Sequence, residues 1–383
     1  MTALLVLNQS QSPAFQQMIE NASAPASVWF LTAEGVEPSR PDVTTLKAPR
    51  YQRRSAAARA ASWVAYAGVA FMRARTLAPN LVLAVTNPPF IPHVAWAVQK
   101  LGGAPYGLLI WDIYPDHLHH VGVISESHPL SRAWVALNRR ALAHAEFVVT
   151  ISEGMAQKLR DQLAGVQAKI KVIPNWSDTE QLRPIPRANN PWARELGVTD
   201  ELVVMYSGNL GATHGLDGLL GAAAHLADNP GVRFLIIGRG LGRATVEREV
   251  ARRGLRNIRI MDPVPWSELN YSLALADVAV VSQAPGTEHL SIPSKTYSAL
   301  AAGSAILALT GRESDLSRLV TRTLAGHVRE FSDSAGIARV LEEWQRDRSA
   351  LDHCKVAART AAVSSFSLGQ ITSQWQETLA PYL

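Results

Sequence analysis

Residues 203–216 read VVMYSGNLGATHGL, and this stretch decides the fold. It begins with apolar residues typical of a buried strand, passes through a glycine-rich turn, and ends where a helical apolar pattern starts. Short apolar runs and longer amphipathic stretches alternate in this way along the whole chain. That alternation predicts an α/β fold built from βαβ units around parallel sheets.

The chain has 383 residues, which is too long for one typical domain. Residues 175–192 are rich in turn formers and separate two alternating series. We predict a doubly wound, Rossmann-like domain over 1–183, a second over 184–365, and a C-terminal helix over 366–383 that packs back on the first domain. Ligands bind beyond the carboxyl ends of strands in such sheets, so we expect the two domains to face a deep cleft. The predicted strands are 3–7, 28–31, 81–85, 108–110, 147–150, 171–173, 202–206, 234–237, 258–260, 278–281 and 305–309.

The composition indicates a cellular compartment but does not identify a binding partner. The one cysteine, Cys354, rules out an internal disulfide and fits a reducing compartment, so we expect a cytoplasmic protein. The longest uncharged apolar run outside the first strand, residues 63–72, is about half of what a membrane-spanning helix needs. A net charge of +5 suits several anionic partners and selects none of them. We expect no nucleic-acid partner.

A basic and aromatic segment at residues 50–75 has helical character. Arg53, Arg54, Arg59 and Trp63 are typical of a face that lies on an anionic membrane. The alternative is a solvated helix that packs its aromatic side chains into the core. Both interpretations stay open at this point.

The turn that follows residues 203–206 is a candidate phosphate loop. Small residues let the backbone approach an anion closely, and the next helix offers unpaired N–H groups at its N-terminus. Ser207, Gly208, Asn209 and Gly211 are therefore candidate ligands of a phosphate group. The alternative is that the glycines serve turn geometry alone.

A second glycine turn follows the strand at 234–237, and its sequence is GRGLG. It differs from the dinucleotide fingerprint, which spaces its glycines as G-x-G-x-x-G on the first turn of a domain. Nicotinamide binding is therefore not expected. Arg239 is instead a candidate donor of two hydrogen bonds to a diphosphate, the alternative being a solvated arginine.

The third signal lies at residues 283–303, where a loop carrying Glu288 opens a helix at Pro293 or Ser294. Lys295 falls in the first turn of this helix, where a cation opposes the helix dipole unless an anion is bound there. Lys295 is therefore a candidate to neutralise a departing diphosphate. A solvated lysine is the alternative.

In this order and spacing the three turns resemble the nucleotide-sugar domain of glycosyltransferase family 4, which is retaining and has the GT-B fold. The resemblance covers essentially the whole chain and points to the bacterial surface-polysaccharide branch. It implies that residues 207–209 form the diphosphate loop and that Val264 and Pro265 hold the base through backbone contacts. The Pro293-Ser-Lys295 motif and the segments 87–90 and 111–116 resemble the same branch.

The chain also departs from the family pattern. Ser298 stands where many members have a glutamate that contacts the ribose, and Glu288 matches the first glutamate only through a longer loop. Asn209 and His214 replace the usual arginine and lysine of the diphosphate loop. The resemblance then leaves the phosphate charge to Lys295 and Arg239.

In the first half, Asp116 and His117 follow the strand at 108–110 and lie at the predicted carboxyl edge. His117 is a candidate to contact the donor sugar or the acceptor hydroxyl. Neighbouring Asp and His residues suggest a metal site, but their spacing gives no defined ligand set. The resemblance also implies that neither a metal nor a cofactor is needed, with the nucleotide sugar as substrate.

These observations predict a retaining glycosyltransferase that moves a sugar from a nucleotide diphosphate sugar to a glycan or polyprenyl-linked acceptor. We expect it to act in surface-polysaccharide or glycoconjugate synthesis, with peripheral contact to the inner face of the plasma membrane. Two alternatives are a nucleotide-sugar epimerase and a non-catalytic subunit that binds a nucleotide sugar.

Overall fold

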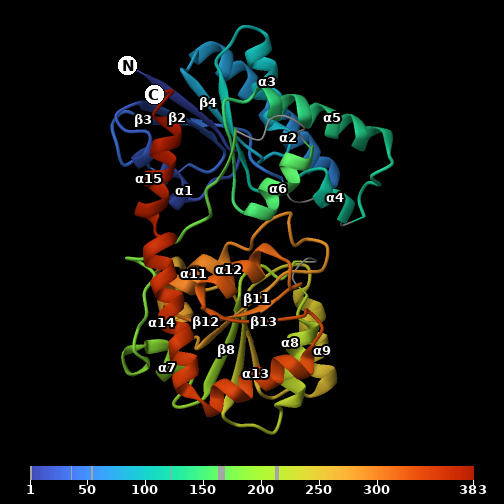
Figure 1. The fold of residues 1–383 in the computed structure, drawn as a ribbon, viewed down its shortest axis with the longest axis vertical. Helices are drawn as coiled ribbons and strands as arrows, with labels where there is room; N and C mark the ends of the chain where they lie inside the picture. Colours follow the sequence, from blue (N-terminus) through green and yellow to red (C-terminus); the bar gives the residue numbers. More distant parts are fainter. Residues whose placement is uncertain (1, 36, 53–54, 121, 163–168, 212–214) are drawn as a thin grey trace. The chain divides into compact units, whose positions relative to one another are not determined.

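The computed structural model describes residues 2–35, 37–52, 55–120, 122–162, 169–211 and 215–383. The chain forms two compact units, shown in Figure 1. The first unit comprises Met1–Pro174 and Gly369–Leu383, and the second comprises Asn175–Leu368.

The first unit is built on a seven-stranded parallel sheet in the order β3-β2-β1-β4-β5-β6-β7. Strands β1, β4 and β5 are buried along their whole length, which explains their continuous apolar sequences. The sequence-based prediction missed β3, because its sequence VTTLK is partly polar and it lies at the sheet edge. The strands are β1 (Ala3–Leu7), β2 (Ser27–Thr32), β3 (Val43–Lys47), β4 (Leu81–Val85), β5 (Tyr106–Ile110), β6 (Val148–Thr150) and β7 (Ile170–Val172).

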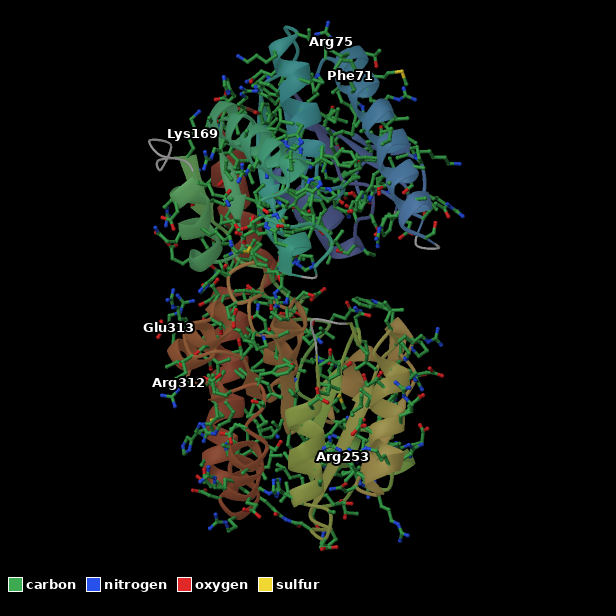
Figure 2. The ribbon with its side chains drawn as sticks, turned by 90° about the vertical axis from the view of Figure 1, so that its right-hand side faces the viewer. Phe71, Arg75, Lys169, Arg253, Arg312 and Glu313 are labelled. Atoms are coloured by element: carbon green, nitrogen blue, oxygen red, sulfur yellow. The ribbon has the colours of Figure 1, made fainter. Side chains whose placement is uncertain are left out.

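Helices cover this sheet, and α3 packs against both α2 and α5. Proline at the first turn helps to start α1, α3 and α5, and the Ser12 hydroxyl caps α1 by accepting from Phe15 N. Phe71 and Arg75 lie on the last turns of α2 (Figure 2). The helices are α1 (Pro13–Ala22), α2 (Ala56–Leu77), α3 (Ile91–Lys100), α4 (Asp116–His120), α5 (Pro129–His144) and α6 (Glu153–Gln162).

The second unit has a six-stranded parallel sheet in the order β10-β9-β8-β11-β12-β13. Val204 and Tyr206 on β8 belong to the core on one face, and Val203 and Met205 belong to the core on the other. The short edge strand β13, with the sequence GHVR, was not predicted. The strands are β8 (Leu202–Ser207), β9 (Val232–Ile237), β10 (Ile258–Met261), β11 (Val278–Ser282), β12 (Ala305–Leu309) and β13 (Gly326–Arg329).

Helices lie on both faces of the second sheet, as in other doubly wound folds (Figure 1). Helix α8 packs closely on α13, and α11 packs on α14. The helices are α7 (Pro191–Glu195), α8 (Asp217–His225), α9 (Arg243–Arg253), α10 (Leu269–Ala274), α11 (Lys295–Ala302), α12 (Asp315–Thr323), α13 (Ser334–Arg346) and α14 (Arg348–Ser365), with two short 3-10 helices, η2 (Arg187–Asn189) and η3 (Trp266–Glu268).

The division between the units falls after Pro174, earlier than the boundary that we expected after residue 183. Residues 175–183 stay with the second unit because the Arg359 guanidinium donates to the carbonyls of Thr179 and Leu182, both at 2.9 Å. A β-bridge between Ser177 and Ser367 adds to this attachment.

The last helix, α15 (Leu368–Leu379), belongs to the first unit from Gly369 onward. Trp375 on this helix is buried, and the Tyr382 ring lies 5.5 Å from the Phe147 ring. The Thr2 hydroxyl donates to the Leu383 carbonyl at 2.6 Å, so the two ends of the chain lie side by side (Figure 1).

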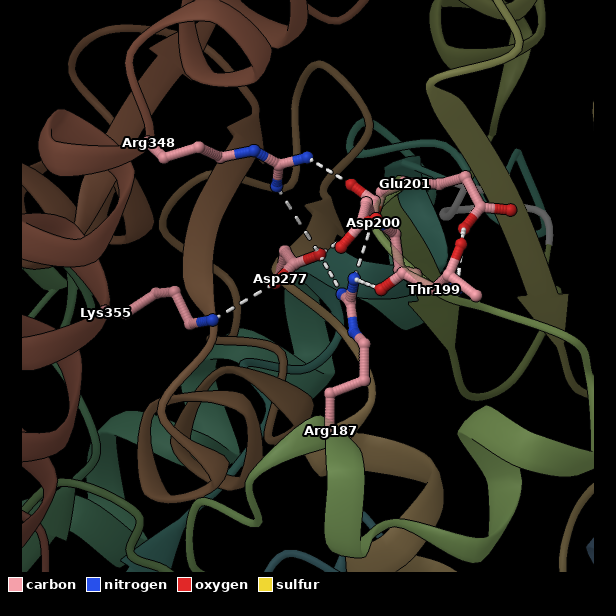
Figure 3. Close-up of polar contacts among 8 residues, drawn as sticks. Arg187, Thr199, Asp200, Glu201, Asp277, Arg348 and Lys355 are labelled. Atoms are coloured by element: carbon pink, nitrogen blue, oxygen red, sulfur yellow. Dashed lines mark hydrogen bonds and ion pairs between the residues drawn. The ribbon is translucent and has the colours of Figure 1, made fainter.

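A buried carboxylate holds the amino edge of the second sheet together (Figure 3). The side chain of Asp277 is 10 % exposed and lies directly before β11. It forms ion pairs with Arg187, with Lys355 at 3.1 Å and with Arg348 at 3.9 Å. It also accepts from Val203 N at 3.0 Å, so one carboxylate joins β8, β11, α14 and the segment before α7.

Within the residues that the structure describes, every helix is too short or too polar to cross a lipid bilayer.

Candidate nucleotide site

The order of strands places a ligand crevice between β8 and β11. The chain leaves β8 toward β9 on one side, whereas β11 pairs with β8 on the other side. Loops that diverge at such a reversal of strand order leave a crevice at the carboxyl edge of a doubly wound sheet. The glycine turn at 207–211 and the loop that leads to Lys295 both start from this edge.

The two glycine turns of the second unit pack against each other. Gly208 N donates to the Ile237 carbonyl at 2.9 Å, and Leu210 N donates to the Arg239 carbonyl at 2.8 Å. Gly208 has a φ of 143° and Gly238 a φ of 158°, which disfavour other residues. A Cβ on Gly238 would lie only 1.9 Å from the Gly208 carbonyl oxygen, so this close approach requires glycine.

Lys295 is the first residue of α11, and its amine lies directly over the glycine turn. A Cβ built on Gly208 would lie 3.1 Å from both Cε and Nζ of Lys295. The Lys295 Nζ donates to the Tyr206 hydroxyl at 2.6 Å and lies 3.8 Å from the centroid of the Tyr206 ring. The Tyr206 hydroxyl in turn donates to the Asn209 carbonyl at 2.7 Å. Lys295 and the glycine turn are therefore brought together, as the nucleotide hypothesis requires.

Burial lowers the pKa of the Lys295 amine to about 7, and burial is the only cause of this shift. Among the ion pairs of the described residues, none involves Lys295. Its nearest polar partner is a neutral hydroxyl. A buried amine without a counter-ion gains most from an anion that enters the site.

A cavity of about 200 Å³ adjoins this amine. Ser207, Gly208, Lys295 and Ser298 all line it. Ser298 occupies the position where the family resemblance implies a glutamate, so the wall of this cavity carries a hydroxyl there instead. Four of the predicted donor residues thus share one cavity.

The other predicted residues of this unit lie around the edge without lining the cavity. Asn209 is exposed, Gly211 is partly buried, and Ser294 precedes α11 without capping it through its side chain. Glu288 lies beside the loop after β12, because a Cβ built on Gly311 would lie 3.3 Å from its Oε1.

Arg239 is 72 % exposed, and its Nε lies 3.5 Å from Asp262 Oδ1. Val264 packs partly against the core next to α10, and Pro265 is exposed at the start of η3. All three follow β9 or β10 at the carboxyl edge. They do not line the 200 Å³ cavity.

In the first unit, Asp116 and His117 are neighbours on α4 with different surroundings. Asp116 forms an ion pair with Lys158 at 2.7 Å, which engages its carboxylate. The buried Nδ1 of His117 has no hydrogen-bond partner among the residues that the structure describes, and the His117 ring lies 5.7 Å from the Tyr114 ring. Burial raises the pKa of Asp112, and the charge of His117 opposes that rise. Asp112, which clusters with Asp116 and His117 in the sequence, is therefore a carboxylate that interacts electrostatically with His117.

Sequence reasoning also missed a group of buried amides at the carboxyl edge of the first sheet. Asn8, Gln9 and Gln11 follow β1 directly and are buried. The Asn87 side chain donates to Asn8 Oδ1 at 3.1 Å and to the Ser10 carbonyl at 2.9 Å. The sequence signal was a polar run, NQSQ, immediately after an apolar strand.

Of the four residues predicted to contact a membrane or the acceptor, the structure describes Arg59 and Trp63. The Trp63 ring stacks on Tyr51 at 6.2 Å and meets the edge of Phe90 at 6.0 Å. The guanidinium of exposed Arg59 lies 5.8 Å from the Trp63 ring. Arg53, Arg54 and His214 lie outside the described residues.

No three His, Cys, Asp or Glu side chains gather as a metal-ligand set within the described part of the chain. Whether the reaction needs a metal stays a prediction.

Two family models match the chain, one for each half. The Glycosyl transferase 4-like domain matches residues 19–176, and Glycosyl transferases group 1 matches residues 190–361. The two parallel sheets with their covering helices agree with this class. The chain therefore belongs to the family-4-like glycosyltransferases of the GT-B fold.

Among curated proteins, the chain is similar to the probable glycosyltransferase WbjE of Pseudomonas aeruginosa. The two are 26% identical over 264 residues, which cover 69% of this chain and 66% of WbjE. It is also 30% identical over 237 residues to the putative colanic acid biosynthesis glycosyl transferase WcaI of Escherichia coli (strain K12). That match covers 61% of this chain and 58% of WcaI, so the chain matches less than two thirds of either relative.

Solved structures share the fold over their whole length. Anabaena Alr3699/HepE, determined in complex with UDP-glucose, matches with a TM-score of 0.76 at 18% identity and covers 100% of both chains. Sucrose-phosphate synthase from Thermosynechococcus elongatus matches with a TM-score of 0.79 at 15% identity, covering 100% of this chain and 99% of that chain.

Proposed function

We propose that this glycosyltransferase moves a sugar from a nucleoside diphosphate sugar to a glycan or polyprenyl-linked acceptor, with retention of anomeric configuration. One observation carries the donor class: the buried Lys295 amine lies over the Gly208 turn and has no carboxylate partner among the described residues. The UDP-glucose complex of HepE supports the same class of donor. The name of WcaI, with its role in colanic acid biosynthesis, supports a surface-polysaccharide product.

The chemistry follows from where negative charge develops. The bond between the anomeric carbon and the phosphate oxygen breaks, and the bonding electrons leave with the diphosphate. A protonated Lys295 would neutralise that charge as it grows, and it would do so most strongly in the transition state. The acceptor hydroxyl attacks the same face of the sugar, and its proton passes to the departing phosphate oxygen. This scheme requires no separate catalytic carboxylate pair.

The first unit supplies candidates for the acceptor side. His117 is one candidate, and its buried Nδ1 has no hydrogen-bond partner among the described residues. Asp116 is held by Lys158, so its part would be to fix the start of α4. We expect activity to persist in EDTA, because a protonated Lys295 would balance charge on the phosphates without a metal.

A ligand screen tests the donor class. Uridine, guanosine and adenosine diphosphates and their sugars are compared by thermal shift, since a ligand at 100 times its Kd adds about 2.7 kcal/mol of stability. A clear rise in Tm with one base identifies the donor. If none of these ligands changes Tm, the proposal is wrong. Incubation with the preferred donor alone then separates a transferase from an epimerase, because only the epimerase makes a new nucleotide sugar.

A membrane role is favoured by the charge of α2, α3 and α5. These helices pack side by side, and none of them contains an acidic residue. Val64, Met72 and Leu130 are more than half exposed on them, so the exposed parts of these helices carry apolar as well as cationic groups. The basic residues are Arg59, Arg73 and Arg75 on α2, Lys100 on α3, and Arg132, Arg139 and Arg140 on α5. Figure 2 labels Arg75.

Vesicle sedimentation tests this surface. The wild-type chain should bind vesicles that contain phosphatidylglycerol, and a variant with Arg73, Arg132 and Arg139 changed to glutamate should lose that binding. A control variant with Arg248, Arg252 and Arg256 changed to glutamate alters the net charge equally in the second unit. Equal binding of the two variants would argue against this surface.

A further inference from the structure

A second cleft in the second unit lies at the amino ends of β9 and β10, the two outermost strands on that side of the sheet. Its lining residues come from the first residues of these strands and from the turns that precede them. Its volume is about 380 Å³, whereas the cavity beside Lys295 at the carboxyl edge measures about 200 Å³. Three arginines line the cleft, and none of the described residues that line it is acidic. The unit therefore has room for an anion at a second place.

The register of the sheet brings the three arginines together. Arg233 is the second residue of β9, and Arg259 is the second residue of β10. Arg259 pairs with Leu235, which lies two residues after Arg233 on β9. Because paired residues, and residues two apart on a strand, point to the same face of a sheet, Arg233 and Arg259 share one face of adjacent strands. Arg256 comes from the turn between α9 and β10 and completes the group.

One of these three positive charges is balanced within the chain. The Arg233 guanidinium donates to Glu201 Oε1 and to the Leu196 carbonyl, both at 2.6 Å. Arg256 and Arg259 are exposed, and in the described part of the chain neither guanidinium has an ion-pair partner. A cleft lined by charges of one sign concentrates counter-ions of the other sign. Two positive charges in this cleft are therefore available to an anion from solution.

Hydrogen bonds hold the walls of this cleft in place without a ligand. The Asn257 side chain donates to the carbonyls of Ala223 and Leu226 at 2.8 and 3.1 Å, which ties the turn before β10 to the C-terminal end of α8. The Asn229 side chain exchanges hydrogen bonds with Gln345 on α13, at 2.7 and 3.1 Å. A site whose walls are already ordered loses less entropy when a ligand binds.

The lining matches a phosphate ester better than other anions. Each guanidinium can donate two parallel hydrogen bonds to phosphate oxygens. A phosphate monoester carries a charge of about −1.5 to −2 at pH 7, which balances two arginines, whereas a carboxylate balances one. Pro230, Val232 and Ile258 add an apolar part to the lining, which suits the organic group of an ester.

The surroundings of the cleft favour a soluble ligand over a lipid headgroup. A surface that lies on a membrane exposes large apolar side chains beside its basic ones. Among the described residues, none of the exposed large apolar side chains lies on α8, α9 or β10, or in the turns that border the cleft.

We propose that this cleft is a second anion site, which binds the phosphate group of a soluble phosphate ester between Arg256 and Arg259. The inference goes beyond the proposed function and does not depend on it, because the cleft shares no lining residue with the cavity beside Lys295. The two sites can therefore be removed one at a time.

Equilibrium dialysis with radiolabelled pyrophosphate counts the anion sites of the chain. The wild-type chain should bind two pyrophosphates, one at Lys295 and one in the cleft. The double variant Arg256→Gln, Arg259→Gln should bind one, and Lys295→Met should also bind one. If the double variant binds as many as the wild-type chain, the inference is wrong. If Lys295→Met binds as many as the wild-type chain, the proposed donor site fails and the second anion site stands.

A matched double variant controls for the loss of charge. Arg248→Gln with Arg252→Gln removes two exposed arginines of α9 that do not line the cleft, and it should still bind two pyrophosphates. The Tm of each variant checks that it is folded. If this control loses a site as the Arg256 and Arg259 variant does, net charge explains the binding and the inference is wrong.

Two further probes separate a soluble ester from a lipid headgroup. Phenyl phosphate carries one phosphate and an apolar ring, and it should displace the pyrophosphate that Lys295→Met retains. Vesicles that contain phosphatidic acid should bind the wild-type chain and the Arg256 and Arg259 variant equally. No displacement by phenyl phosphate, or a loss of vesicle binding in the variant, would overturn the assignment to a soluble ester.

Discussion

The two edges of the second sheet treat buried charge in opposite ways. At the amino edge, Asp277 is surrounded by Arg187, Lys355 and Arg348 and also accepts a backbone N–H (Figure 3). At the carboxyl edge, the polar partner of Lys295 within the described part of the chain is the Tyr206 hydroxyl, and burial lowers the Lys295 pKa to about 7. One charge is balanced within the chain, whereas the other has no ion-pair partner among the described residues.

From this difference alone, we expect a structural role for Asp277 at the amino edge and a binding role for Lys295 at the carboxyl edge. A buried charge with partners stabilises the fold, because its desolvation is offset within the chain. A buried charge without partners destabilises the unliganded fold, and a ligand of opposite sign removes that cost. We therefore expect substitutions around Asp277 to change stability and substitutions around Lys295 to change binding and turnover.

The largest effect is expected for Asp277→Ala. Its loss leaves three cations and the Val203 N–H without their shared acceptor, and breaking a buried ion pair of this kind costs about 3 to 5 kcal/mol. Urea denaturation measures the loss, and turnover per folded molecule should stay unchanged. Glu249→Ala is the control, because that carboxylate also meets two arginines, Arg252 and Arg253, but on an exposed helix. If both variants lose the same stability, burial does not explain the role of Asp277.

The sequence predicted the strands with the strongest apolar runs and missed those where the pattern is weak. The predicted strand at 81–85 is β4 to the residue, because both of its faces are buried. Edge strands β3 and β13 were missed, since an edge position tolerates polar residues such as Thr44 and His327.

One residue of the candidate site could be predicted from the sequence, because its charge is unfavourable at its position in the helix. A lysine in the first turn of α11 opposes the helix dipole, and that conflict identified Lys295 from the sequence. The pairing of Asp116 with Lys158 depends on contacts between separate helices, which spacing along the chain does not reveal. The unoccupied volume beside Ser298 is likewise a property of packing between α10, α11 and the sheet.

At the carboxyl edge, Lys295→Met should lower turnover and nucleotide affinity by about 100-fold. Removing one preorganised donor to a developing negative charge has an effect of this size. Denaturation should show equal or greater stability, because the substitution removes a buried, unpaired amine. Lys355→Met makes the same change at the other edge and should lose stability while keeping turnover. Normal turnover in Lys295→Met would remove the basis of the proposed donor site.

The smallest effect concerns pH. In the unliganded chain the Lys295 pKa of about 7 lies below its ordinary value of 10.5, so the folded state binds fewer protons than the unfolded state between these values. This group therefore makes stability rise as pH increases from about 7 to 10.5. A bound diphosphate favours the charged amine and raises its pKa again.

Nucleotide binding should accordingly take up a proton above pH 7, and affinity should fall by up to tenfold for each pH unit between 7 and 9. Calorimetry in two buffers with different ionisation enthalpies measures the uptake at pH 8, where we expect close to one proton for the wild-type chain. Lys295→Met should take up almost none under the same conditions, which removes the titration of the nucleotide itself as an explanation. Equal proton uptake in both chains would show that the Lys295 amine stays charged without ligand. The pKa of Lys295 would then not be lowered, and the electrostatic contrast between Lys295 and Asp277 would be wrong.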